Sequence, residues 1–374
     1  MNCCHLKKYF VAALLILLCS IFSARALSSE VLIFDYTADD SVSEKWVGIA
    51  LTDYSIRILN SSESGKAMDR ERLKKIISRW TSGKSNNLSF ETKDAIRVHA
   101  GAVSLIECEI NEDPSGIHFI GTIINPDSGI LKDISFSIKE FDLHSLKQSL
   151  LNKLVEEYSL SEIISENNIE TTSSDIAYTR YWQAMYSYEN GMIDKAYSLF
   201  EKAAELDPGY VEAFIMKGKI LLEKTRFSEA IEHLKHSIEI DPENAKAHFL
   251  LGLTYYFQRQ NIPARIEFDK ALELDPGNPE YHYQTGLYSK EKFNYKRALE
   301  ELTVTVEMDP SIYFAWYHLA TIYASLKNDQ KALDCLQEAA RWGKKNILPM
   351  IENDSDLDLL RGNPRFLAIV RPLK

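Results

Sequence analysis

The residues that could perform chemistry are few, and each pattern lacks a required partner. Gly83-Lys84-Ser85 has the ending of a phosphate-binding loop, but Ser78 stands where that loop needs a glycine, so the backbone amides cannot wrap around a phosphate. His233 and His236 stand three residues apart on a predicted helix, and no third ligand with metal-binding spacing accompanies them. We therefore expect a polar loop at the first place and a solvated helix face at the second.

Four further histidines are candidates by residue type alone. His248 and His282 take equivalent places in two predicted helices and are expected to pack between helices. His99 and His118 are lone histidines in the amino-terminal part, where an unrecognised enzyme site would be sought first. The sequence has no Gly-x-Ser-x-Gly, Cys-x-x-Cys or His-Glu-x-x-His motif. We predict that the protein is not an enzyme and that it has no catalytic, cofactor-binding or metal-ligating residues.

The amino terminus has the layout of a secretory signal peptide. Lys7 and Lys8 precede an apolar run over residues 9–22, and small residues follow at Ala24 and Ala26. Because a spanning helix needs about 20 apolar residues, cleavage after Ala26 is favoured over a retained membrane anchor. The sequence thus predicts a periplasmic or secreted bacterial protein, with no stable membrane span once residues 1–26 are removed.

The cysteines bear on how the chain is processed, and the net charge bears on which partners it can bind. Cys19 offers lipidation as the alternative processing route, although Leu18 stands where such a signal needs a small residue. Cys108 and Cys335 fall in different predicted domains, so no disulfide framework is expected. Removal of residues 1–26, which hold three basic and no acidic residues, takes the formal net charge from -11 to -14. An acidic surface repels phosphate backbones, which argues against a nucleic-acid partner.

The carboxy-terminal half repeats every 34 residues. An aspartate-proline pair marks each period, and small residues recur at its eighth and twentieth positions, with a bulky apolar residue at the twenty-fourth. Two helices approach closely only where side chains are small, so each period is expected to be a pair of packed helices that ends at the proline. The prolines are Pro208, Pro242, Pro276 and Pro310; the eighth-position column is Ala184, Gly218, Gly252, Gly286 and Ala320; the twenty-fourth is Phe200, Leu234, Phe268, Leu302 and Leu336.

These columns resemble the tetratricopeptide repeat (TPR) family. The resemblance implies five helix pairs over residues 177–346, wound into an all-α superhelix, with a carboxy-terminal cap over 347–374. The sequence departs from the family at the fourth position, where a bulky residue is usual. Arg180, His248 and His282 stand there in three of the units, while Trp316 supplies the expected aromatic residue in the fifth.

The amino-terminal part, residues 27–158, is predicted to be an α/β (α+β) domain with helices covering a small mixed sheet. Turn-forming residues separate three strand-like segments, so an antiparallel meander is expected. With Ala100-Gly101-Ala102 before the meander and Asp127-Ser128-Gly129 at its last turn, the domain resembles the TolB amino-terminal-like family, which implies an interaction module without catalytic residues. A polar linker is predicted over 159–176. The expected strands are 31–34, 103–110, 117–124 and 130–138, and the expected helices pass through 46–58, 73–80 and 143–155.

The family pattern also indicates which residues face a partner. In such arrays the second, fifth, ninth and twelfth positions of each first helix line a concave groove, and here these are mostly aromatic or aliphatic. About half of them are expected to pack within the superhelix. The rest are expected to form an apolar strip that binds a peptide or helix, and the lysines among them could bind an acidic group of that partner. The predicted groove residues are Tyr178, Tyr181, Met185, Tyr188, Ile215, Lys219, Leu222, Lys246, Phe249, Leu253, Tyr256, Tyr283, Leu287, Lys290, Phe314 and Tyr317.

The features together predict an exported scaffold or adaptor that binds a peptide or helix of a cell-envelope protein. The alternative is a sensory or regulatory module without an output domain of its own. Neither the partner, the pathway nor the oligomeric state is indicated by the residues.

Overall fold

A computed structural model describes residues 30–38, 42, 44–60, 66–68, 70–81, 88–100, 102, 104–125, 129–139, 142–158, 172 and 174–373. The predicted signal peptide, Gly83-Lys84-Ser85 and most of the predicted linker lie outside these residues. The chain divides into two compact units, with the boundary between Met192 and Ile193. Among the described helices, none is both long enough and apolar enough to span a bilayer.

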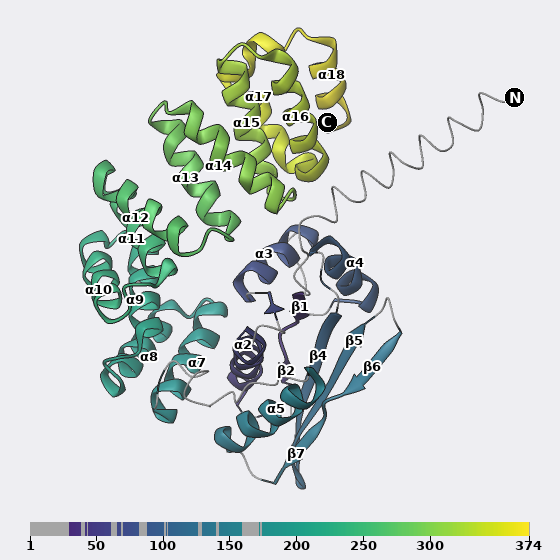
Figure 1. The fold of residues 1–374 in the computed structure, drawn as a ribbon, viewed down its shortest axis with the longest axis vertical. Coiled ribbons are helices and arrows are strands. Elements are labelled where there is room, and N and C mark those ends of the chain that lie inside the picture. The colour runs from purple at the N-terminus through teal and green to yellow at the C-terminus, as the bar shows by residue number, and fades with distance from the viewer. Residues whose placement is uncertain are drawn as a thin grey trace, which may run out of the picture. The chain divides into compact units, whose positions relative to one another are not determined.

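The amino-terminal unit is built on a mixed sheet with the strand order β3-β1-β4-β5-β6 (Figure 1). β1 pairs in parallel with β3 and β4, and β2 in parallel with β4, whereas β4, β5 and β6 form the predicted antiparallel meander. The expected small mixed sheet is therefore confirmed. Its strands are β1 (Glu30–Ile33), β2 (Thr37–Ala38), β3 (Lys66–Ala67), β4 (Ser104–Asp113), β5 (Gly116–Asn125), β6 (Ile130–Asp133) and β7 (Phe136–Ile138).

Helices cover this sheet and bury its apolar strands. Leu32 and Leu105 share one cluster with Leu73 of α3 (Arg70–Thr81) and Ile96 of α4 (Phe90–Ala100). α2 (Trp46–Asn60) contacts β1, β2 and β3 and packs against α5 (Leu143–Tyr158). The sequence predicted α2, α3 and α5 but missed α4, because α4 buries few residues and so has only a weak apolar period.

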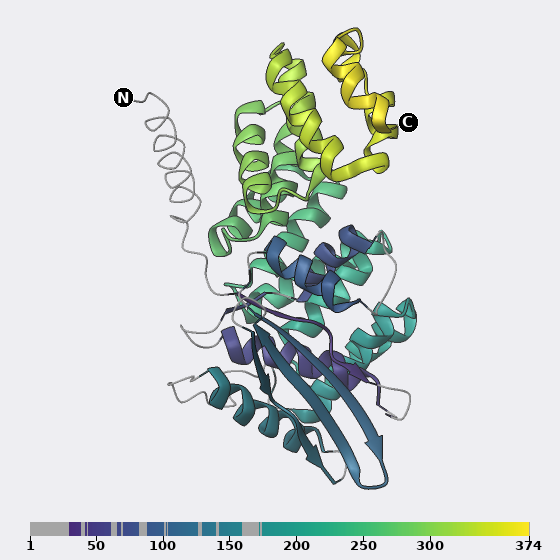
Figure 2. The ribbon, with the colours of Figure 1, turned by 90° about the vertical axis from the view of Figure 1, so that its right-hand side faces the viewer.

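The third strand of the meander is interrupted, although one strand was expected over 130–138. β6 and β7 both pair with β5, and Ile134 and Ser135 separate them. The hydroxyl of Ser135 accepts a hydrogen bond from the Gly121 N–H at 3.1 Å. A Cβ atom at Gly121 would come within 2.7 Å of Ile134 and 2.8 Å of the Cys108 sulfur, so only glycine fits beneath the break. Figure 2 shows β4 and β5 as a long twisted hairpin.

The carboxy-terminal part is a succession of antiparallel helix pairs. The first predicted pair is α7, which belongs to the amino-terminal unit, and α8; the later pairs and a run of short helices follow in order. Their bounds are α7 (Asp175–Glu189), α8 (Ile193–Leu206), α9 (Val211–Glu223), α10 (Phe227–Ile240), α11 (Ala245–Phe257), α12 (Asn261–Leu274), α13 (Pro279–Glu291), α14 (Tyr295–Met308), α15 (Tyr313–Ser325), α16 (Asp329–Gly343), η1 (Lys344–Ile347), α17 (Leu348–Asn353), η2 (Ser355–Leu360), α18 (Pro364–Val370) and η3 (Arg371–Leu373).

The small and bulky columns of the repeat interlock as predicted. A Cβ atom placed on Gly252 would lie 2.8 Å from the Phe268 ring, and one on Gly218 would lie 2.6 Å from Leu234. The eighth position is therefore small because the bulky residue of the second helix lies directly against the first helix. The pairs α9–α10, α11–α12 and α13–α14 therefore close to van der Waals contact at this point.

The turns between helices are also periodic. Each aspartate of the Asp-Pro pairs follows the last helical residue, and its carboxylate accepts the N–H two residues on, for example from Gly277 to Asp275 at 3.2 Å. Inside each pair, the turn places the fifteenth residue at positive φ, although four of the five residues there are not glycine. Nothing in the sequence indicated this second turn. Its residues are Gly191, Thr225, Arg259, Phe293 and Lys327.

The unusual fourth-position histidines perform the structural role of the family aromatic residue. Trp316 Nε1 donates to the Pro310 carbonyl at 3.0 Å, and His282 Nε2 lies at 3.0 Å from the Pro276 carbonyl. The other ring nitrogen of His282 lies 2.7 Å from a Glu301 oxygen. Burial opposes the charged ring, but the bonds to Glu301 and the carbonyl outweigh it and raise the pKa of His282 above its ordinary value. His248 makes the equivalent contacts with Pro242 and Glu267, so both histidines pack between helices as predicted.

Overpacking of the interlock is expected to destabilise the array. Gly252→Val places a branched side chain where Phe268 already lies, and we expect a loss of about 1–3 kcal/mol in the free energy of unfolding. Gly277→Ala is the matched control, since a Cβ atom there meets only Asp275 at 3.5 Å; its effect should stay within about 0.5 kcal/mol. Urea unfolding of both variants gives the comparison, and equal stabilities would refute the packing argument.

The bonds of His282 predict that the stability of the array depends on pH, with a sign that follows from the raised pKa of this histidine. Because the folded pKa of His282 is raised, its contribution to stability is complete below the unfolded pKa of about 6.5 and is lost as the pH rises through the folded pKa. His282→Trp keeps a donor for the Pro276 carbonyl, as in Trp316, and does not titrate. Urea unfolding at pH 6 and pH 9 should therefore show a smaller loss in the variant than in the natural chain. An identical pH dependence in both would exclude this role.

Candidate functional site

Within the carboxy-terminal unit, which begins at Ile193, the predicted groove residues lie on the first helix of each successive pair: α9, α11, α13 and α15. Contacts join these helices across the repeats: the Tyr256 hydroxyl donates to Glu291, and Lys290 Nζ donates to Thr321 Oγ1 at 2.7 Å. Burial and the bond to Glu291 raise the pKa of Tyr256 to about 12. The tyrosine therefore stays neutral and keeps its donor at physiological pH.

The groove residues differ in what they expose. Ile215, Phe249 and Tyr317 are buried: Phe249 stacks on Tyr281 with ring centroids 4.5 Å apart, and the Tyr317 hydroxyl donates to Asp354. These three support the superhelix, which is fewer than the half of the set that was expected to do so. Phe314 is exposed, and the others are half-buried: Lys219, Leu222, Lys246, Leu253, Tyr256, Tyr283, Leu287 and Lys290.

The four α7 residues of the prediction belong to a different environment. Tyr178, Tyr181 and Met185 are buried, and Tyr188 is half-buried. The Tyr178 hydroxyl donates to the Ala50 carbonyl of α2 at 3.4 Å. Since α7 packs on α2, the Tyr178 ring takes part in a joint with the amino-terminal domain and is not displayed to a partner.

An ionic network strengthens the same joint. Lys147 of α5 is buried, and its ammonium lies 4.4 Å from the Tyr178 ring centroid. The buried Arg70 guanidinium bonds Asp35 at 2.5 and 2.9 Å and Glu189 of α7 at 2.5 and 3.0 Å. Burial works against both charged forms, but the pairing keeps the pKa of Asp35 below and that of Arg70 above its ordinary value. The first repeat helix is thus fastened to the sheet domain by charge as well as packing.

A polar cluster lies at the end of the groove nearest the carboxy terminus. Burial and the nearby charge of Lys290 lower the pKa of His318 to about 3, so the ring is neutral at physiological pH. Burial also lowers the pKa of Lys290, although Asp356 and Asp354 oppose the shift. Sequence reasoning singled out Lys290 but missed His318, because its position is not among the four that point inward in the family pattern.

The remaining histidine candidates do not assemble a reactive site. His236 lies 3.5 Å from Glu239, and its ring packs against Phe214. His118 bonds Ser137 at 2.8 Å and Ser115 at 3.1 Å, at the β4–β5 turn. The His99 side chain lies outside the described residues. Across the described ranges, no three His, Cys, Asp or Glu side chains are placed to share a metal ion.

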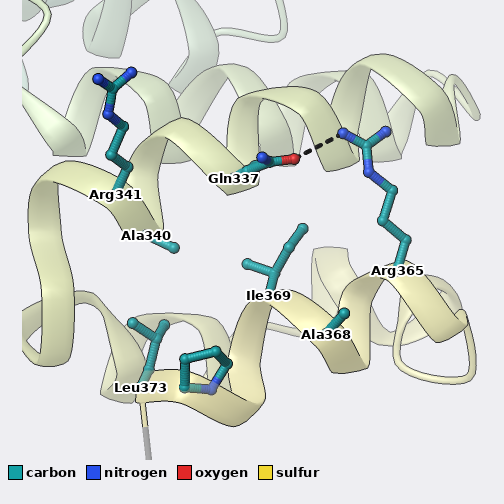
Figure 3. A pocket seen from close by; sticks show the side chains of 8 residues that line it. Gln337, Ala340, Arg341, Arg365, Ala368, Ile369 and Leu373 are labelled. Carbon is teal, nitrogen blue, oxygen red and sulfur yellow. Dashed lines mark hydrogen bonds between the residues drawn. The ribbon is translucent and has the colours of Figure 1, made fainter.

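A separate pocket of about 360 Å³ opens between α16 and α18 (Figure 3). Its floor is apolar and includes Ala340 and Ile369, and its two arginines are already engaged. Arg365 bonds Asp334 at 2.7 Å and Gln337 at 3.0 Å, and Arg341 lies 3.4 Å from Glu338. No predicted groove residue lines this pocket.

Comparisons with known proteins agree with the repeat pattern. The TPR repeat model matches residues 218–258, and two tetratricopeptide repeat models match 187–236 and 245–278 with 315–346. A search of the curated proteins gives no match.

The similar solved structures match less than half of this chain. MamA is 21% identical, with 44% of this chain and 95% of MamA covered and a TM-score of 0.40. YrrB, described as a TPR protein with an unusual peptide-binding site, is 24% identical, with 44% and 86% covered and a TM-score of 0.38. TTC0263, a TPR protein of Thermus thermophilus, is 20% identical, with 48% and 98% covered and a TM-score of 0.40. The matched family models and the interlocking helix pairs show that this chain carries tetratricopeptide repeats between residues 187 and 346.

Proposed function

We propose that the protein is an exported scaffold or adaptor whose repeats bind a peptide or helix of another cell-envelope protein. The observation that carries this proposal is the strip of half-buried and exposed apolar side chains along four successive first helices. Half-buried aromatic and aliphatic residues in a row offer anchor points without collapsing into the core. The strip consists of Leu222, Leu253, Tyr256, Tyr283, Leu287 and Phe314.

The amino-terminal domain is proposed to be a second interaction module, of the TolB amino-terminal-like type. Its support is the mixed sheet with helices on it and the attachment of α7 through Arg70 and Tyr178. Through these contacts α7, the first helix of the repeats, packs as part of the amino-terminal domain. Export is proposed from the charged, apolar and small-residue layout of residues 1–26.

The groove is tested by affinity capture from cell-envelope extract with residues 27–374 as bait. The variant Tyr283→Ala/Leu287→Ala/Phe314→Ala should lose a partner that the natural bait retains, because each truncated anchor costs about 1 kcal/mol or more. The matched control, Ile262→Ala/Ile266→Ala/Phe293→Ala, truncates exposed apolar residues outside the strip and should keep the partner. Circular dichroism confirms that both variants are folded. Equal capture by all three baits would remove the groove from the proposal.

Export has its own test. The full chain, produced in a Gram-negative host, is fractionated and its amino terminus sequenced. We expect periplasmic protein that begins at Leu27, because Ala24 and Ala26 form the small-residue cleavage site. A membrane-bound product with an intact amino terminus would indicate a retained anchor, and a lipidated amino terminus at Cys19 would indicate the alternative processing. Recovery only from the cytoplasm would refute export.

A further inference from the structure

The Lys290 ammonium lies in the groove with unused hydrogen-bonding capacity. It is carried by the last turn of α13, and Nζ donates to Thr321 Oγ1 of α15 at 2.7 Å. Thr321 itself donates to the His318 carbonyl at 2.9 Å, which leaves its lone pairs for the lysine. An ammonium has three N–H donors, and within the described part of the chain no carboxylate forms an ion pair with Lys290.

A second unsatisfied group lies on the same face of α15. The His318 ring packs between Tyr317 and Tyr283, with centroid distances of 5.1 and 6.2 Å. Its Nδ1 atom is buried and makes no hydrogen bond to any described residue. A buried polar atom without a partner costs free energy, so such atoms commonly mark a place where a partner binds. His318 and Thr321 are three residues apart on α15, so both groups belong to one helix face.

The nearest acids do not satisfy the lysine. Asp354 accepts the Tyr317 hydroxyl with one oxygen and the Asp356 N–H at 2.9 Å with the other, which fixes it as the cap of η2. Asp354 and Asp356 favour the charged form of Lys290 through space, yet neither forms an ion pair with it. They therefore hold the ammonium charged without occupying its free donors.

Burial at this place makes an added carboxylate favourable. Lys290 is partly removed from water, which lowers its pKa, and the neutral His318 adds no competing charge. A desolvated charge with no counter-ion gains more from a carboxylate than an exposed lysine does, because its desolvation cost is already present in the free protein.

We propose that Lys290 and His318 form a subsite for a carboxylate of the bound segment, either an acidic side chain or the terminal carboxylate, while the buried Thr321 hydroxyl holds the ammonium in place. The Tyr283 ring lies against His318, and Leu287 stands three residues before Lys290 on α13. These two side chains would accept the neighbouring apolar residues of that segment. This inference rests on the proposed groove function and assigns the chemistry of the partner at one point.

The test uses two displayed libraries of random 12-residue peptides, one with a free carboxy terminus and one embedded between fixed flanks. Residues 27–374 should select peptides with a carboxylate at a fixed spacing from an apolar residue. Selection from the free-terminus library alone identifies a terminal carboxylate, and selection of Asp or Glu from both identifies a side chain. Lys290→Met should lose this preference and bind the best selected peptide roughly 10- to 100-fold more weakly. Lys290→Arg should keep the preference.

The control is Lys292→Met, which removes an exposed lysine of the same repeat at the turn after α13; it should select the same peptides as the natural chain. Thermal unfolding of each variant separates folding from binding. If Lys290→Met lowers the melting temperature but selects the same acidic peptides, Lys290 only neutralises the cap and the subsite is overturned. Selected peptides without acidic preference overturn the subsite and leave the groove function standing. Failure of the natural chain to select any peptide overturns both.

Discussion

The close contact between the eighth and twenty-fourth positions of the second, third and fourth repeats is the constraint on which the rest of the array depends. Gly218 meets Leu234, Gly252 meets Phe268 and Gly286 meets Leu302 at distances that leave no room for a Cβ atom. This contact sets the separation of the two helices in a pair. Because the same contact recurs every 34 residues, the first helices α9, α11 and α13 present the same face in each repeat.

Hydrogen bonds also connect the first helix of a repeat to the turn that precedes it. The fourth-position ring reaches back to the carbonyl of the preceding proline, whether the residue is His282 or Trp316. An imidazole here differs from an indole because its second nitrogen can also bind Glu301 on the second helix. In the His282 repeat, a polar contact with Glu301 thus replaces the apolar contact of an aromatic ring, while the bond to the Pro276 carbonyl is kept. Because the pKa of His282 is raised, the stability of its repeat depends on pH.

The amino-terminal domain changes how the groove is interpreted. Tyr178 and Glu189 of α7 are held by α2, by Lys147 and by Arg70, so the first predicted set of inner residues is engaged within the chain. This ionic joint would be weakened if Asp35 were protonated, since Arg70 would then be left buried with fewer partners. If the proposed function holds, the surface offered to a partner is therefore the one on α9, α11, α13 and α15, which includes the polar cluster around Lys290.

The repeat length, the helix ends and the columns of small and bulky residues could all be predicted from the amino-acid sequence, because they depend on contacts within one repeat or between neighbours at a fixed spacing. Alternation and turn residues likewise indicated the mixed sheet and its meander. The same reasoning missed α4, the break at Ile134 and Ser135, and the positive φ values of Thr225 and its equivalents. Which inner residues are covered, and that Lys290 and His318 lie together with unmet bonding capacity, emerged only from the tertiary fold. Burial and counter-charge come from helices far apart in the chain, and no local pattern encodes them.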